Sequence, residues 1–204
     1  MADNPTPEVV HRLPQQPVHL FQLNTSPEAY RNAMGCGAFS TSMALSVYDP
    51  ETYGTYEMAR EIFGQMLKVP VFGGTFENQN GTVARRLGFQ ADDYDYGTSD
   101  DLMAAIDLGA PVVILINPTK HLGIGTHDVL LVGYSVDASG ACLRVFIDNP
   151  AVESGAQPAP AGLSYPGNQI IEVADLPHKW TGVFTPMFSM PEVWAQWRRQ
   201  VHRG

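Results

Sequence analysis

Basic residues and cysteines are both scarce in this sequence. It has 12 Lys and Arg against 21 Asp and Glu, which gives a formal net charge of -9 at pH 7. A surface with this charge repels phosphate backbones and anionic lipid headgroups, so neither nucleic acid nor a membrane is an expected partner. The two cysteines, Cys36 and Cys142, give no indication of a disulfide framework.

Long apolar runs and a targeting segment are also missing. The longest apolar runs, such as residues 111–116, are far shorter than the roughly 20 residues needed to cross a bilayer. The N-terminus lacks the basic stretch and apolar stretch of a secretory signal. We therefore expect a soluble protein that is cytoplasmic, or exported by a route without a recognisable signal peptide. The sequence leaves its oligomeric state open.

The chain length is suited to one domain, because 204 residues with 44% apolar content can bury one full hydrophobic core. Residues 1–16 contain several prolines and little periodicity, which predicts a flexible N-terminal arm. Residues 17–204 are then expected to form a single domain. Its first strand is expected near residues 18–22.

Apolar spacing predicts helices early in the chain and strands late. Helices are expected over residues 37–48, 56–67, 76–87 and 191–201, with another starting at Ser99. Strands are expected over residues 111–117, 127–135, 143–148, 169–173 and 183–189. This order predicts an α+β fold in which a helical layer packs against an antiparallel sheet.

Cys36 is the candidate nucleophile. It lies between Gly35 and Gly37 at the start of an expected helix, where unpaired amide groups and the helix dipole favour a thiolate. We therefore expect the helix terminus to lower the pKa of this thiol toward neutrality. The glycines leave room for a substrate carbonyl, and the Cys36 amide can donate to an oxyanion.

His127 is the candidate general base. It is the first residue of an otherwise apolar strand, so its ring can leave the sheet edge toward a cleft. The next strand ends in Asp148 and Asn149, either of which can accept a hydrogen bond from the second ring nitrogen. Adjacent antiparallel strands bring these residues together, which is the arrangement that cysteine hydrolysis requires.

Five segments in this order resemble the papain-like cysteine peptidase superfamily, and within it the branch similar to bacteriocin double-glycine leader peptidases. The matching segments are FQLN at 21–24, GCGAFSTSMAL at 35–45, LGAPVVILIN at 108–117, HDVLLVGYS at 127–135 and FIDNP at 146–150. The resemblance implies a papain-like fold over about residues 17–190. It also implies a bacterial enzyme that acts on amide bonds.

The resemblance assigns roles to further residues. It implies that Gln22 donates to the oxyanion, with Asn32 as the alternative donor because it lies closer to Cys36 in sequence. The branch usually places Asp directly before the proline, whereas this chain has Asn149 there and Asp148 one position earlier. Successive strand residues face opposite sides, so only one of the two can point at His127 unless a bulge intervenes.

The expected function is a cysteine peptidase that cleaves an amide bond of a peptide or protein through an acyl-enzyme on Cys36. Two alternatives stay open: an inactive papain-like binding module, and a deamidase or transglutaminase-like acyltransferase, since the same residues serve several acyl transfers. No cofactor is expected. The spacing of His121, His127 and His178 does not match a metal site, so no metal is expected either.

Overall fold

The computed structural model describes residues 8–23, 35–68, 79–117, 126–153 and 167–201. Its helices are α2 (Cys36–Ser46), α3 (Pro50–Tyr53), α4 (Tyr56–Gln65), α5 (Asn80–Arg86), α6 (Ser99–Asp107), α7 (Leu176–Lys179) and α8 (Pro191–Val201). Its strands are β1 (Val9–Arg12), β2 (Gln90–Ala91), β3 (Val112–Ile116), β4 (His127–Val136), β5 (Cys142–Asp148), β6 (Gln169–Glu172) and β7 (Trp180–Phe188). The predicted α+β fold, with helices packed on an antiparallel sheet, is confirmed.

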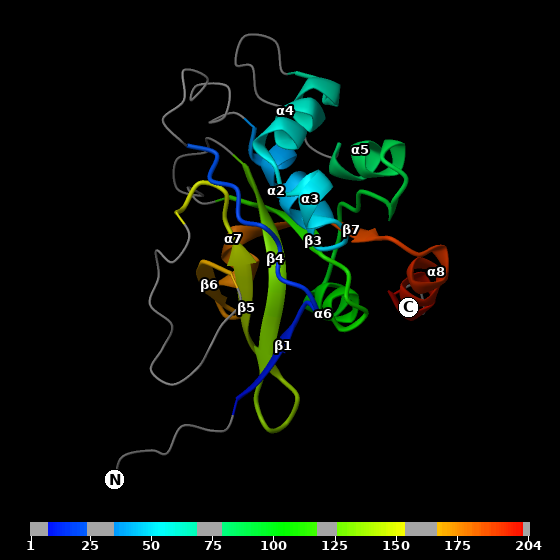
Figure 1. The fold of residues 1–204 in the computed structure, drawn as a ribbon. Helices are drawn as coiled ribbons and strands as arrows, with labels where there is room; N and C mark the ends of the chain where they lie inside the picture. The colour runs from blue at the N-terminus through cyan, green and yellow to red at the C-terminus, as the bar shows by residue number, and fades with distance from the viewer. Residues whose placement is uncertain (1–7, 24–34, 69–78, 118–125, 154–166, 202–204) are drawn as a thin grey trace.

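The strands form one seven-stranded sheet in the order β2-β7-β3-β4-β5-β6, with β1 also paired to β4. Every pairing is antiparallel. The long strand β4 is shared: β3 pairs with its first half, and β1 pairs with residues 133–136 near its end. Figure 1 shows β4 running through the middle of the sheet, with α2 to α5 grouped together near the end where β4 begins.

Helix α2 is buried from Gly37 to Ser46, and it packs against β3, β4 and α4. Its sequence, CGAFSTSMALS, contains only apolar and small polar residues, so it has no charged face to expose to water. Phe39, Met43 and Leu45 are at most 2% exposed and belong to the main core. The burial of this helix fixes the position of its first residue, Cys36, relative to the start of β4.

Two N-terminal segments differ from the sequence expectations. Residues 9–12, expected to belong to a flexible arm, form β1, because β4 is longer than β3 and offers unpaired backbone groups beyond it. Residues 18–22, expected to form the first strand, lie outside every described strand. Their backbone amides are bonded mainly to side chains of α2 and α4. In the described ranges, no helix has the length and hydropathy to span a bilayer.

Candidate active site

Cys36 is the first residue of α2, and Gly35 is the N-cap. Gly35 has no side chain with which to cap this helix, so the first amides of α2 lack the usual N-cap acceptor. Such amides can stabilise the negative oxygen of a tetrahedral intermediate. Cys36 is half-buried as a residue, although its thiol group is largely shielded from water.

The hydrogen-bond partner of the Cys36 sulfur is the carboxylate of Asp128, with Sγ 3.8 Å from Oδ2. Burial of the thiol, followed by the nearby negative charge of Asp128, raises the pKa of Cys36 to about 12. Backbone amides of Asp128 and Gly37 act in the opposite direction but do not compensate. The expected lowering of this pKa is therefore contradicted, because desolvation and a neighbouring carboxylate outweigh the helix terminus.

Asp128 is held in place by polar groups on two helices. Asn80 of α5 donates from Nδ2 to Oδ1 of Asp128 at 3.1 Å, and Thr41 of α2 donates to Oδ1 of Asn80 at 3.1 Å. Ser40 donates to the Asp128 backbone carbonyl at 3.0 Å. A Cβ at Gly37 would lie 2.9 Å from Oδ2 of Asp128, so the absence of a side chain there permits this close approach. The carboxylate is thus fixed beside the sulfur.

His127 is paired with Asn149, whose Oδ1 lies 2.8 Å from the ring Nε2. Because an amide oxygen can only accept, we assign the ring hydrogen to Nε2, which leaves Nδ1 as the basic nitrogen. Burial lowers the pKa of His127, and the hydrogen bond to Asn149 offsets only part of this effect. The imidazole is therefore neutral at pH 7 and able to accept a proton.

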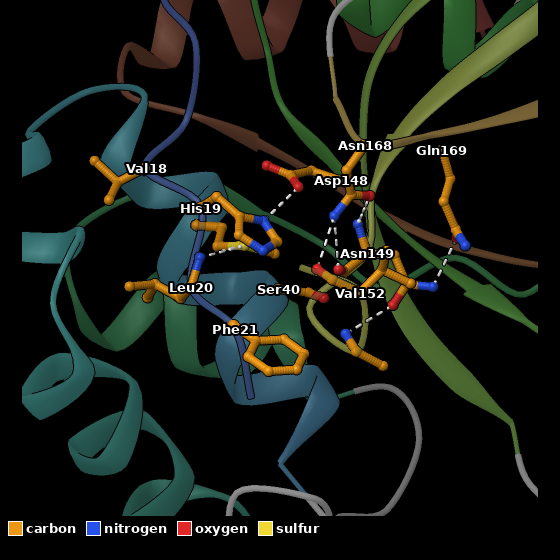
Figure 2. A network of polar contacts seen from close by, with 12 residues as sticks. Val18, His19, Leu20, Phe21, Ser40, Asp148, Asn149, Val152, Asn168 and Gln169 are labelled. Carbon is orange, nitrogen blue, oxygen red and sulfur yellow. Dashed lines mark hydrogen bonds and ion pairs between the residues drawn. The ribbon is translucent and has the colours of Figure 1, made fainter. Parts of the chain in front are cut away.

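The orientation of Asn149 is determined by its neighbours (Figure 2). Its Nδ2 donates to Oε1 of Gln169 at 2.8 Å, so its Oδ1 is the atom directed at His127. Asn168 bonds both backbone groups of Asn149, accepting from the amide at 2.8 Å and donating to the carbonyl at 3.0 Å. Asn149 is only 7% exposed, and these contacts prevent its amide from turning over.

Asp148 points elsewhere. Its Oδ1 lies 2.6 Å from Nδ1 of His19, a residue outside the described strands and helices. Asp148 is the last residue of β5 and Asn149 follows it directly, and consecutive residues of extended backbone project to opposite sides. Of the two candidates left open by the sequence, the structure places Asn149 at His127 and Asp148 at His19.

Gln22 is brought to the same end of the sheet. Its backbone amide donates to the carbonyl of Pro150 at 2.8 Å, one residue beyond Asn149, and the residue is 3% exposed. The alternative oxyanion donor, Asn32, lies outside the described residues. The bond to Pro150 therefore places Gln22 close to Asn149, although the two residues are far apart in the chain.

Within the described residues, no hydrogen bond joins the Cys36 sulfur to the His127 ring. The structure thus contains two separate pairs, Cys36 with Asp128 and His127 with Asn149. Asp128, which contacts the nucleophile, directly follows the proposed base His127 in β4. Catalytic hydrogen bonds often form fully only in the substrate complex, so this arrangement is compatible with a resting hydrolase.

Sequence reasoning missed Asp128, Asn80 and His19. Asp128 carried a usable signal, since it is a charged residue at the start of the apolar run HDVLLVGYS. Asn80 and His19 carried none, because each lies in a segment whose contacts depend on how distant elements pack. Among the described residues, no three His, Cys, Asp or Glu side chains are gathered in a way that could hold a metal ion.

Comparison with known proteins identifies the family. Residues 15–160 match the model of the Peptidase_C39 like family. The chain belongs to this family. The matched region includes Gln22, Cys36, His127, Asp148 and Asn149, so all five predicted site residues lie within the part of the chain that carries the family pattern.

One of the similar solved structures supports the fold. The peptidase domain of Streptococcus ComA, a bi-functional ABC transporter involved in a quorum sensing pathway, is 16% identical with a TM-score of 0.50. That match covers 78% of this chain and 93% of the ComA domain. The peptidase domain of Streptococcus mutans ComA is 17% identical over 56% of this chain and 75% of that domain, with a TM-score of 0.37. Comparison with curated proteins found no match. The expected resemblance to papain-like leader peptidases is confirmed.

Proposed function

We propose that this protein is a cysteine hydrolase that cleaves an amide bond of a peptide or protein through an acyl-enzyme on Cys36. The hydrogen bond between His127 and Asn149 carries this proposal. It orients a half-buried, neutral imidazole at the start of β4, directly before the residue that contacts the nucleophile. Membership of a cysteine peptidase family supports the same assignment.

In the proposed mechanism, Nδ1 of His127 takes the proton from Cys36 as the sulfur attacks the amide carbon. The resulting imidazolium keeps its Nε2 hydrogen bond to Asn149. It then gives its proton to the nitrogen of the leaving amine, and the C–N bond breaks to leave a thioester on Cys36. Water, deprotonated by His127, hydrolyses the thioester and restores the thiol.

The proposed oxyanion donors are the Cys36 backbone amide and the Gln22 side chain. The Cys36 amide belongs to a helix N-terminus without a side-chain cap, and Gln22 is fixed to the β5 end through Pro150. Donors of this kind each stabilise a transition state by about 3 kcal/mol. Loss of the Gln22 amide group should therefore slow acyl transfer about 100-fold.

Because the thiol is protonated at rest, proton transfer must accompany attack. A cysteine with a raised pKa has few thiolates at neutral pH, so the reaction depends on His127 as a base within each turnover. His127 must approach the sulfur when substrate binds, and the sulfur must then exchange Asp128 for His127 as its partner. Mutation of His127 should consequently remove turnover and not merely change its pH dependence.

The test is covalent capture of Cys36 together with peptide turnover. A peptide library is incubated with the wild-type protein and with C36S, H127A and C142S, and products are detected by mass spectrometry. A peptidyl electrophile is used in parallel to map the labelled residue. We expect wild type and C142S to cleave peptides and to be labelled at Cys36. We expect no peptide cleavage by C36S or by H127A. Turnover that survives in C36S contradicts the proposal.

One observation favours a second candidate, a papain-like module that binds peptides without cleaving them. The Asp128 carboxylate occupies the position beside the sulfur and disfavours the thiolate. A protein of this kind should bind members of the same peptide library, while wild type and C36S release no products. Binding without products therefore selects the module over the hydrolase.

A further inference from the structure

Residues 18–22 contact the end of β5 and the residues that follow it. The ring Nδ1 of His19 lies 2.6 Å from Oδ1 of Asp148 (Figure 2). The Gln22 amide donates to the Pro150 carbonyl at 2.8 Å. One contact therefore lies at the residue before Asn149, and the other at the residue after it. The segment that carries Gln22 is tied to both sides of the residue that contacts His127.

The opposite side of this segment is held by helices. Val18 donates its amide to the hydroxyl of Ser46 at 2.8 Å, and Leu20 donates to the sulfur of Met43 at 3.3 Å. Phe21 bonds the hydroxyl of Tyr56 through both its amide and its carbonyl. The segment thus lies between α2 and α4 on one side and the end of β5 on the other, and its contacts with Asp148 and Pro150 connect it to the His127 side of the site.

The His19–Asp148 pair is shielded from water. The side chains are 15% and 7% exposed, respectively. Burial lowers the pKa of His19, but the hydrogen bond and the negative charge of Asp148 outweigh it, so the net pKa is raised. A hydrogen bond with the Val152 backbone also raises this pKa, but that backbone group carries no charge. Asp148 is therefore the charged group that controls this histidine.

We propose that His19 and Asp148 are positioning residues whose ion pair holds the Gln22 segment against the strand end that carries Asn149. This inference rests on the proposed function. The pair fixes the spacing between the oxyanion donor and the amide that orients the base. Since a displacement of about 1 Å can slow catalysis about 100-fold, loss of the pair should lower kcat by about 10- to 100-fold with little change in KM.

The chain provides a matched control in a second histidine pair. His11 Nδ1 lies 3.0 Å from Asp107 Oδ1, with side chains 36% and 49% exposed. His11 is in β1, opposite Tyr134 near the far end of β4 from His127. The same substitution, His to Gln, can therefore be made at both pairs, and only His19→Gln removes a shielded charge beside the proposed site.

The first readout is independent of turnover. Hydrogen exchange of the Gln22 amide is measured by NMR in wild type, H19Q, D148N and H11Q, with the Leu13 amide as reference, since it donates to Val132 at 3.1 Å. We expect Gln22 exchange to be about tenfold faster in H19Q and D148N, and unchanged in H11Q. Unchanged Gln22 exchange in H19Q overturns the inference whatever the activity.

The second readout is kcat and KM from pH 5.5 to 9.5 with a peptide found in the library screen. In wild type, kcat should decline as pH rises through the raised pKa of His19, because the ion pair is lost. H19Q should have a low kcat without this decline, and H11Q should match wild type. Equal kcat in H19Q and H11Q overturns the inference, whereas absence of any turnover by wild type overturns the proposed function.

Discussion

Asp128→Asn should make Cys36 markedly more reactive toward a small alkylating reagent. The substitution removes the negative charge 3.8 Å from the sulfur and keeps the size of the side chain. The Asn80 amide that now bonds Oδ1 can still bond an amide oxygen, so the local packing is expected to persist. The thiolate should then form at lower pH, since the negative charge of Asp128, the second largest cause of the raised pKa, is gone.

The size of the effect follows from the shift of the thiol pKa. That pKa is raised from 9.0 to about 12, so the thiolate fraction at pH 7.5 is lowered about 1,000-fold. Burial is the largest cause and the negative charge of Asp128 the second. A charge within about 4–6 Å of a titratable group typically shifts its pKa by at least about one unit. We therefore expect alkylation of Cys36 at pH 7.5 to be about tenfold faster in D128N.

The assay measures iodoacetamide labelling of Cys36 by mass spectrometry between pH 6 and 11, in a C142S background. Asp175→Asn serves as the matched control, because Asp175 is exposed and paired with Lys179 at 4.0 Å. The control should label at the wild-type rate. Rapid labelling of the C142S protein near pH 6, or equal rates in D128N and D175N, refutes the reasoning that Asp128 keeps the thiol protonated.

Three further outcomes are expected. Asn149→Ala should lower kcat/KM about 100-fold, because the His127 ring loses the acceptor that orients it. Thr98→Ala should lower the free energy of unfolding by about 1 kcal/mol in urea titrations, because Thr98 forms a capping box with Asp101 at the start of α6. The stability lost in H19Q should be greatest below pH 6.5 and vanish as pH rises through the raised pKa of His19.

Each of these outcomes has a control. Unchanged kcat/KM in N149A contradicts the role given to the His127–Asn149 bond. Thr98→Ser retains the capping hydroxyl and should unfold at nearly the wild-type urea concentration, so equal losses in T98A and T98S contradict the cap. For H19Q, the loss in free energy of unfolding measured by urea titration should be larger at pH 6 than at pH 9. An equal loss at both pH values shows that the His19–Asp148 ion pair is not the source of the lost stability.

Much of the secondary structure was predictable because local pattern decides it. The apolar run of β3 and the β-branched and aromatic residues of β5 identify strands, and Thr98 followed by Asp101 identifies a helix start. The strand expected at residues 18–22 was wrong, although the alternation of VHLFQ favours one. That segment lies between α2 and α4 on one side and β5 on the other, and side chains from the helices take its amides.

Local sequence features were sufficient to select Cys36 and His127, with Asp148 or Asn149 as the partner of His127, and the family resemblance added Gln22. A cysteine between glycines before an apolar helix, and a histidine opening an apolar strand, are local features that the sequence contains directly. The same features determine the α+β fold, because helical and strand periodicities depend only on residues close together in the chain. The family assignment rests on this order as well.

Tertiary structure alone decided which groups act on one another. Asp148 and Asn149 project to opposite sides at the end of β5, and this decides which of them contacts His127. Asp148 instead contacts His19, which is 129 positions away in the chain. The ionisation of Cys36 also depends on burial and on Asp128, which packing brings to its sulfur. Sequence periodicity describes which way a residue faces, whereas pKa values and partners depend on distances between elements, which only the folded chain sets.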